Sequence, residues 1–370
     1  MSTPGNDSID ALALALVEQL WHPSVNTKKR LFNGDAARDL THDSYCEYYR
    51  RQWHLVAGNA DGRYVAVQTA DATNWLAQEL ATNPTKTREE ILESAKSRNG
   101  SVVNAEDEAW NTSVNLAARL LLMLKFGVVK HQRIPRRYLS WTSASLQSFV
   151  RGHFDITPIL NCDRLRLPKT FDAWGVSAIA GIEIDFTDNL ADHLLLVEDD
   201  SKVLIFHHAS FLECQDKQVS NSQGSLFPDG LVDETLRTLA LLFPQSEFSR
   251  RRGHRRFRGR GRKQKWFSNL REKTREHCTV DARLTLCGNL QAEDRQIEHF
   301  RFWRDRLVIL KQAYDDATPR TLSQWWCDRR NGVQWYTFWV AILVLLITTF
   351  LGLMQCIESA LQVYKAYVPG

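Results

Sequence analysis

The residues best suited to carry chemistry in this sequence are acidic, histidine and cysteine side chains between positions 188 and 214. The group consists of Asp188, Asp192, His193, His207, His208 and Cys214. A zinc or iron site needs three such ligands to converge on one point. Asp188 and Asp192 would share a face if their segment were helical, and a hairpin could bring His193 near His207. The candidate metal ligands are therefore Asp188, Asp192, His193 and His207.

A structural role explains the same residues without a metal. Neighbouring residues of a β-strand point to opposite faces of the sheet, so at most one of His207 and His208 should face inward. In this interpretation one histidine is packed in a small sheet, and the acidic residues are solvated in turns. We favour this interpretation and expect no metal and no cofactor.

Motifs that carry catalysis are absent from the sequence. It contains no GxSxG elbow, no HExxH, no GxxxxGK[ST] phosphate loop and no GxGxxG after a strand. The seven cysteines are scattered and never spaced as CxxC. That usage indicates neither a disulfide framework nor a zinc site, and it is typical of a reducing compartment. We therefore expect a protein that is not an enzyme.

One stretch before the C-terminal region is strongly basic. Ten of the sixteen residues from Arg250 to Lys265 are Lys or Arg, whereas the whole chain holds 47 basic and 43 acidic residues. Because an Arg/Gly-rich segment cannot bury an apolar core, residues 249–267 are predicted to form a disordered basic insert. The arginines that are candidates for contact with lipid or nucleic acid are Arg250, Arg251, Arg252, Arg255, Arg256, Arg258, Arg260 and Arg262.

Several partners could suit this insert. Its arginines alternate with Phe257 and Trp266, so nucleic acid could bind through phosphate pairing and base stacking. An anionic cytosolic leaflet would attract the same charge. We favour lipid, because a membrane anchor would hold the insert close to a bilayer. A nuclear-import signal and a solvated insertion without function are the remaining interpretations.

The C-terminal region holds an apolar segment without parallel in the chain. The 27 residues between Arg330 and Glu358 carry no charge, and about 20 apolar residues in a helix are enough to cross a bilayer. Aromatic residues at its start are typical of a membrane interface. The predicted span is 333–354, and its residues include Val333, Trp335, Tyr336, Trp339, Leu346 and Met354.

The charges beside the span predict its orientation. Lys311, Arg320, Arg329 and Arg330 precede it, whereas only Lys365 follows. Positively charged flanks stay in the cytosol, so we expect a cytosolic N-terminal body and a short lumenal tail. So short a tail predicts post-translational insertion, as in a tail-anchored protein. The long apolar span favours the endoplasmic reticulum or another endomembrane over the mitochondrial outer membrane.

The periodicity of the remaining chain predicts a mainly helical fold with a small sheet. Apolar spacing and capping residues predict helices over Ile9–Leu20, Thr73–Leu80, Thr87–Ser97, Asn115–Gly127, Ser145–His153 and Gly230–Pro244, the last with Asp233 as its N-cap. Three β-rich runs follow one another between residues 180 and 208, and the turn signal Asp199-Asp200-Ser201 joins the last two as a hairpin. We expect a small antiparallel sheet beside the helices.

A further apolar stripe lies close to the membrane region. Ile297, Phe300, Trp303, Leu307, Leu310 and Tyr314 recur at helical spacing. This stripe either packs on the body or pairs with an unknown protein partner. Pro319 ends the predicted helix, and a new helix near Leu322 is expected to continue into the membrane.

These predictions combine into one fold class and five regions. The fold class is mainly α with a small antiparallel β-sheet (α+β) and a single C-terminal transmembrane helix. The regions are a poorly ordered segment (1–44), a cytosolic helical body (45–248), the basic insert (249–267), an amphipathic helical region (268–318) and the juxtamembrane and transmembrane helix (319–370).

Four segments resemble blocks of a family of uncharacterised filamentous-fungal membrane proteins. They are NLADHLLLVEDDSKVLIFHHASFLE, DETLRTLALLFP, HFRFWRDRLVILKQAYDDATP and SQWWCDRRNGVQWYTFWVAILVLLITTFLGLMQCIESALQVYKAY. The resemblance covers about residues 65–245 and 290–367. It implies a lineage-restricted accessory protein with a helical cytosolic body, and by analogy a role at the hyphal surface or in colony morphology. It implies no catalytic residues.

A second resemblance is to CorA-like magnesium channels, which also place a long helix before a C-terminal membrane region. That family uses two spans joined by a Gly-Met-Asn loop, whereas this sequence has one span and lacks that tripeptide. Because of these two differences, an ion-transport-related membrane protein is kept only as the alternative to the main expectation. The main expectation is a membrane-anchored, non-enzymatic interaction or scaffold protein, with the lipid bilayer and an unidentified protein as partners.

Overall fold

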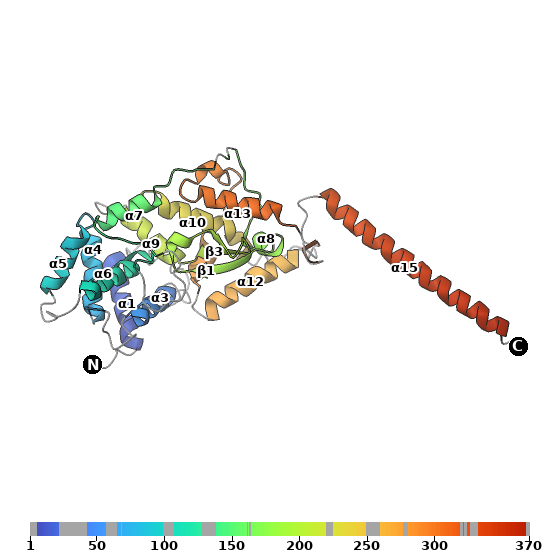
Figure 1. Cartoon of the computed structure of the whole chain (residues 1–370), viewed down its shortest axis with the longest axis horizontal. Helices are drawn as coiled ribbons and strands as arrows, with labels where there is room; N and C mark the ends of the chain where they lie inside the picture. Colours follow the sequence, from blue (N-terminus) through green and yellow to red (C-terminus); the bar gives the residue numbers. More distant parts are fainter. Residues whose placement is uncertain are drawn as a thin grey trace.

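The chain forms a helical body followed by one long helix, α15 (Gly332–Tyr367), that lies apart from it (Figure 1). The structure is a computed structural model, and it describes residues 6–21, 43–56, 65–67, 69–98, 107–127, 138–160, 162, 164–219, 225–248, 260–276, 280–318, 321, 324–325 and 332–367. Helices predominate and one small sheet lies within the body. The predicted mainly helical fold class is confirmed.

Helix α6 is the centre of the N-terminal half of the body. The helices of this half are α1 (Asn6–Trp21), α3 (Asp43–Val56), α4 (Ala70–Thr82), α5 (Arg88–Arg98), α6 (Asp107–Leu122) and α7 (Leu146–Phe154). Helices α3, α4 and α5 all contact α6. The Tyr45 and Tyr48 hydroxyls of α3 donate hydrogen bonds to the Leu120 and Arg119 carbonyls of α6. The predicted helices over Thr73–Leu80, Thr87–Ser97 and Ser145–His153 are confirmed as α4, α5 and α7.

The N-terminal segment is better ordered than its sequence predicts. Helix α1 confirms the expected amphipathic helix, and its apolar side chains Ile9, Ala13, Leu16 and Val17 are buried in the core. The prediction of a poorly ordered segment over 1–44 is therefore wrong for residues 6–21, because a continuous apolar face gives α1 a place in the body. Residues 22–42 lie outside the described part.

The helix predicted over Asn115–Gly127 starts and ends earlier than expected. It is α6, and it ends at Leu122, where Met123 takes a positive φ of 51°. The buried Arg119 guanidinium donates to the carbonyls of Phe126 and Gly127. These bonds fix the chain in its turn away from the helix axis, so the turn occurs before Gly127.

Three short strands form the sheet, with β3 in the middle. They are β1 (Glu183–Thr187), β2 (Leu195–Val197) and β3 (Lys202–Phe206), in the order β1-β3-β2. The β2–β3 hairpin is antiparallel as predicted, but β1 pairs with β3 in parallel. The sheet is therefore mixed rather than antiparallel. The short 3-10 turn η2 (Leu190–Asp192) lies between β1 and β2, and the chain re-enters on the far side of β3.

The C-terminal half of the body packs around this sheet. Its helices are α8 (Ala173–Ala178), α9 (Ala209–Val219), α10 (Leu231–Leu242), α11 (Gln245–Phe248), α12 (Arg260–Glu276) and α13 (Arg304–Asp316), together with the 3-10 turns η3 (Ala282–Leu286) and η4 (Ile297–His299). Helix α8 contacts β1, and α13 contacts β2. Helix α10 confirms the predicted helix, but its N-cap is Gly230, at a φ of 87°, and Asp233 lies in its first turn. Glycine adopts this left-handed conformation without steric cost.

The apolar stripe near the membrane region packs on the body. All six of its side chains, from Ile297 to Tyr314, are buried. They do not belong to one helix, because η4 and α13 are separated by residues whose backbone N–H groups bind the Glu234 carboxylate. The stripe therefore packs on the body, which was the first of the two predicted alternatives. Its buried side chains leave no room for a partner helix on this face.

The basic insert is partly helical. Helix α12 begins at Arg260, and its Phe267 and Leu270 side chains are buried. The prediction of a disordered insert over 249–267 is therefore wrong for residues 260–267. The Arg/Gly composition obscured the apolar side that Trp266, Phe267 and Leu270 provide. Residues 249–259, which include six of the candidate arginines, lie outside the described part of the chain.

Candidate functional site

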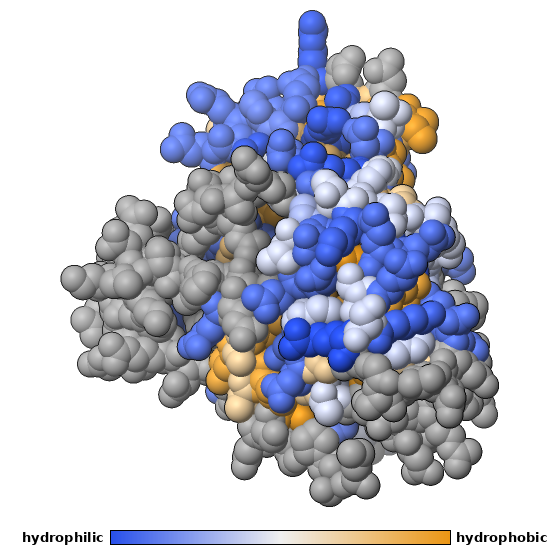
Figure 2. Space-filling view, turned by 90° about the vertical axis from the view of Figure 1, so that its left-hand side faces the viewer, coloured by the Kyte–Doolittle hydropathy of each residue, from blue (hydrophilic) through white to orange (hydrophobic). Residues whose placement is uncertain are grey.

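Helix α15 is long and apolar enough to span a membrane. The candidate span is Trp335–Tyr364, 30 residues, and no part of its most apolar window is buried. The core helix of a soluble protein would be mostly buried, and a signal sequence would lie near the N-terminus. Neither description fits α15. By contrast, hydrophilic side chains dominate the described surface at the opposite end of the body (Figure 2).

The predicted span 333–354 falls inside α15, which continues to Tyr367. The side chains of Val333, Leu346 and Met354 are exposed. The hydroxyls of Thr348 and Thr349 donate to the carbonyl of Leu345 within the helix. A helix in hydrocarbon must satisfy its polar groups internally in this way. The helix expected from near Leu322 is described only in part: Gln324 and Trp325 are helical, and the Trp325 N–H donates to the Thr321 carbonyl at 3.0 Å. Helix α15 is described from Gly332, and residues 322–323 and 326–331 lie outside the description.

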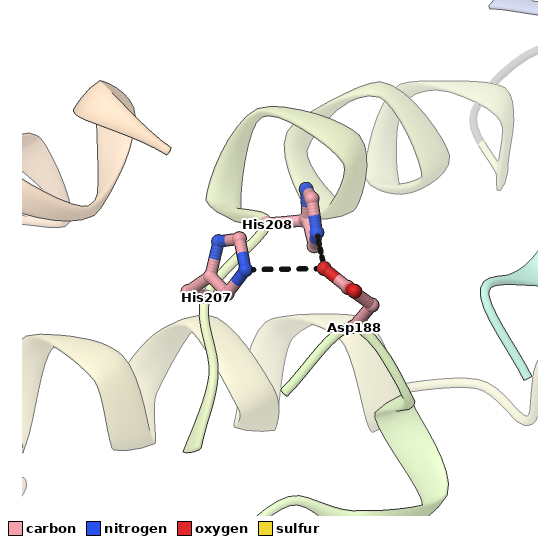
Figure 3. Close-up of side chains that lie close together, drawn as sticks. All are labelled: Asp188, His207 and His208. Atoms are coloured by element: carbon pink, nitrogen blue, oxygen red, sulfur yellow. Dashed lines mark hydrogen bonds and ion pairs between the residues drawn. The ribbon is translucent and has the colours of Figure 1, made fainter. Parts of the chain in front are cut away.

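A second feature is a buried cluster of Asp188, His207 and His208 (Figure 3). Asp188 follows β1, and its Oδ1 atom lies 3.3 Å from His207 Nε2 and 2.8 Å from His208 Nε2. The two imidazole rings lie 3.9 Å apart between centroids. Both rings are buried, and the aspartate side chain is 20% exposed. Only the carboxylate therefore reaches solvent.

Both histidines point at one carboxylate, which the sequence-based rule of alternating faces did not predict. Strand β3 ends at Phe206, so His207 and His208 lie in the turn before α9. Alternation holds only within an extended strand. The prediction that at most one of the two could face inward is therefore wrong.

Hydrogen bonds define the protonation of His207. The backbone N–H of Asp281 donates to its Nδ1 atom at 3.2 Å, so the ring proton is on Nε2 and is donated to Asp188. The Arg51 guanidinium lies 3.1 Å from the other carboxylate oxygen. Burial alone would raise the pKa of Asp188, but hydrogen bonds from both histidines hold it well below its usual range.

His208 is buried in its neutral form. Burial, with the adjacent His207 ring as a second cause, lowers the pKa of His208 to about 3. Its Nε2 atom therefore donates to Asp188, and its Nδ1 atom is buried without a hydrogen-bond partner. A protonated ring would need water or an acceptor at Nδ1, so the site disfavours the charged form.

The other predicted ligands lie elsewhere. His193 is fully buried, and its Nε2 atom lies 2.7 Å from the Thr238 hydroxyl. Its Nδ1 atom accepts the Phe206 N–H at 3.1 Å. Asp192 is buried in η2. Within the described ranges, Asp188, His207 and His208 are the only group of three or more such residues whose possible ligand atoms all lie within 4.8 Å of one another.

The bonding of the cluster does not fit a metal ion. A histidine ligand normally donates its second ring N–H to a carbonyl or carboxylate. His207 instead accepts a backbone N–H at Nδ1, so binding a metal at Nε2 would require loss of its only proton. Arg51 also places a positive charge against the carboxylate. The cluster is better described as a buried junction that joins α3, the end of β1, the start of α9 and η3.

Two partners in this junction were missed by the sequence reasoning. Arg51 lies 137 positions before Asp188, and Asp281 lies 74 positions after His207. The Asp281 carboxylate accepts both the backbone N–H and the hydroxyl of Ser210 at the start of α9. No local pattern links residues so far apart, so the sequence contained no signal for them.

Two of the eight candidate arginines are within the described chain. Arg260 and Arg262 lie in the first turn of α12, and Arg262 is exposed. The neighbouring Lys263 turns inward to the buried Asp172 carboxylate and also lies 3.0 Å from Glu247. The basic stretch therefore contains both a structural cation and exposed cations.

Comparison with known proteins does not assign this chain to a family. No protein-family model, curated protein or solved structure matches it. The resemblance to filamentous-fungal membrane proteins therefore stays a prediction.

Proposed function

We propose that this protein is a single-pass membrane-anchored protein that acts through non-catalytic interactions of its cytosolic body. The observation that supports the anchor is the uncovered apolar length of α15 beside a body in which most large apolar side chains of the described residues are buried. In water, such a helix would expose many large apolar side chains, and contiguous patches of that size mark contact with a membrane or a partner. The 30 residues of the candidate span rise about 45 Å, which is more than the roughly 30 Å needed to cross the hydrocarbon core of a bilayer.

Flanking charge supports the proposed orientation. The residues before α15 include Arg329 and Arg330, and the only Lys or Arg after its uncharged core is Lys365. Lys and Arg close to a span favour the cytosolic side. The body would therefore face the cytosol, on an endomembrane.

A scaffold role is supported by the bonding of the ionisable groups. His193, His207 and Asp281 have their hydrogen-bonding atoms bound within the chain. A general base or nucleophile must instead present a free atom to a substrate. The clusters described above hold the fold together, and the proposed activity is the display of the body at the membrane surface.

Membrane extraction and glycosylation mapping test this function together. Full-length protein would be expressed with an Asn-Gly-Ser acceptor tag either before Met1 or after Gly370. We expect both forms to stay in the pellet after alkaline carbonate. Endoglycosidase should shift the mobility of the second form only.

Each other result contradicts a separate part of the proposal. Release by carbonate would overturn the anchor. A glycosylated tag before Met1 would overturn the orientation. Carbonate resistance without glycosylation of either tag would contradict an endoplasmic-reticulum location.

A further inference from the structure

Helix α12 has one fixed side and one basic side. Phe267 and Leu270 are buried against the body, and Lys263 is paired with Asp172 and Glu247. The exposed side carries three cations and one acid, and we call it the α12 basic face: Arg262, Gln264, Lys265, Ser268, Asn269, Arg271 and Glu272. The helix is thus held on the body with exposed cations on its outer side, of which Arg271 also donates to the Phe248 carbonyl at 3.3 Å.

We propose that the α12 basic face contacts anionic phospholipid headgroups of the bilayer that α15 spans. This inference rests on the proposed membrane anchor. Lys and Arg side chains close to an anionic leaflet are attracted to it, and each adds to the attraction. The half-buried Trp266 sits between the buried side and this face, and tryptophan favours the membrane interface.

Contacts within the chain place α12 near the route to the membrane. Helix α12 contacts α8. Gly181, three residues after α8, lies against Gln324, because a Cβ atom at this glycine would be 2.7 Å from the Gln324 Nε2 atom. Gln324, which precedes α15 in the chain, therefore lies at the end of the body that carries α8 and α12.

The connection to α15 is short. Trp325 is the last described residue before α15, which begins at Gly332. The seven residues from Trp325 to Gly332 reach at most roughly 23 Å when extended, at about 3.3 Å per residue. A body held this close to a bilayer experiences a high effective concentration of headgroups. Weak electrostatic attraction is then sufficient to orient it.

The test is a photo-crosslinking experiment on the full-length chain in nanodiscs. Asn269, on the α12 basic face, is replaced by the photo-crosslinking residue p-benzoylphenylalanine. One set of discs contains phosphatidylcholine alone, and the other also contains phosphatidylserine. We expect lipid adducts at position 269 in the serine-containing discs and roughly fivefold fewer in the neutral discs, as electrostatic attraction requires.

Two double substitutions give the matched comparison. Arg262→Glu with Lys265→Glu should reduce the adducts about as strongly as removing phosphatidylserine does. Lys96→Glu with Arg98→Glu changes net charge equally on α5, at the opposite end of the body (Figure 1), and should leave the adducts unchanged. Circular dichroism and thermal unfolding establish that each variant is folded.

The outcomes separate this inference from the proposed function. A chain that does not incorporate into discs contradicts the anchor, and the inference fails with it. A chain that incorporates but gives equal adducts in both lipids overturns the inference alone. Adducts to co-purified RNA instead of lipid would overturn it in favour of nucleic-acid binding.

Discussion

Helix α15 and the Asp188 junction differ in what surrounds their side chains. In the junction, the two buried histidines and Arg51 find a carboxylate within the chain. In α15, Trp325 stacks on Phe338 near the start of the helix, but no residue of the most apolar window is buried within the described chain. The junction is held by partners within the chain, whereas the apolar surface of α15 requires a partner or a bilayer from outside. The junction should therefore lose stability when one of its partners is removed, and α15 should lose its membrane association when a charge is introduced.

The largest expected effect comes from charge within α15. Leu346→Lys with Phe350→Lys places two ammonium groups near the middle of the span, each costing about 3 kcal/mol in hydrocarbon. Most of the full-length protein should then move from the carbonate-resistant pellet to the soluble fraction. Leu346→Ile with Phe350→Leu is the apolar control and should stay in the pellet. If the doubly charged variant also stays, α15 is not in a bilayer.

A smaller but clear effect is expected from removal of the carboxylate in the junction. Asp188→Ala leaves the Nε2–H groups of His207 and His208 buried without an acceptor. Each such loss costs about 1–3 kcal/mol, so we expect about 3 kcal/mol less stability against urea for the detergent-solubilised chain.

Two matched substitutions sharpen this prediction. Asp185→Ala removes an exposed carboxylate from β1 and should change stability by less than about 0.5 kcal/mol. Asp188→Asn retains an oxygen acceptor and should lie between the two. Equal stability of Asp188→Ala and Asp185→Ala would show that the junction does not stabilise the fold.

The two regions also differ in how far sequence alone could predict them. The span is a local property, and 27 consecutive uncharged residues were enough to locate it. The junction is non-local, because Arg51 and Asp281 reach it from distant segments. The sequence analysis placed His207 and His208 on opposite faces because strand residues alternate, but the strand ends at Phe206 and the rule does not apply beyond it. Similarly, the Arg/Gly composition of the basic insert led to a prediction of disorder. The helical spacing of Phe267 and Leu270, which gives α12 its buried side, was too short a signal to change that prediction.

The smallest effect, and the one that separates the two regions by pH, concerns the buried His193. Burial, with the nearby Arg306 as a second cause, lowers its pKa to about 3 from an ordinary value of 6.5. The unfolded chain therefore gains a proton below about pH 6.5, whereas the folded chain does not until about pH 3. Stability is complete above this window and falls as the pH decreases through it, by up to about 1.4 kcal/mol per pH unit for each such histidine.

His193→Gln should remove one histidine's share of this slope, since the amide can replace both ring hydrogen bonds without titrating. Urea unfolding of the solubilised chain between about pH 5 and pH 7 measures it. Thr238→Val is the matched control: it removes the Nε2 partner and lowers stability throughout, but it retains the titrating ring and hence the slope. Both variants should stay in the pellet after alkaline carbonate, because the substituted residues lie in the body and not in α15. An unchanged slope in His193→Gln would mean that this ring is not buried in its neutral form.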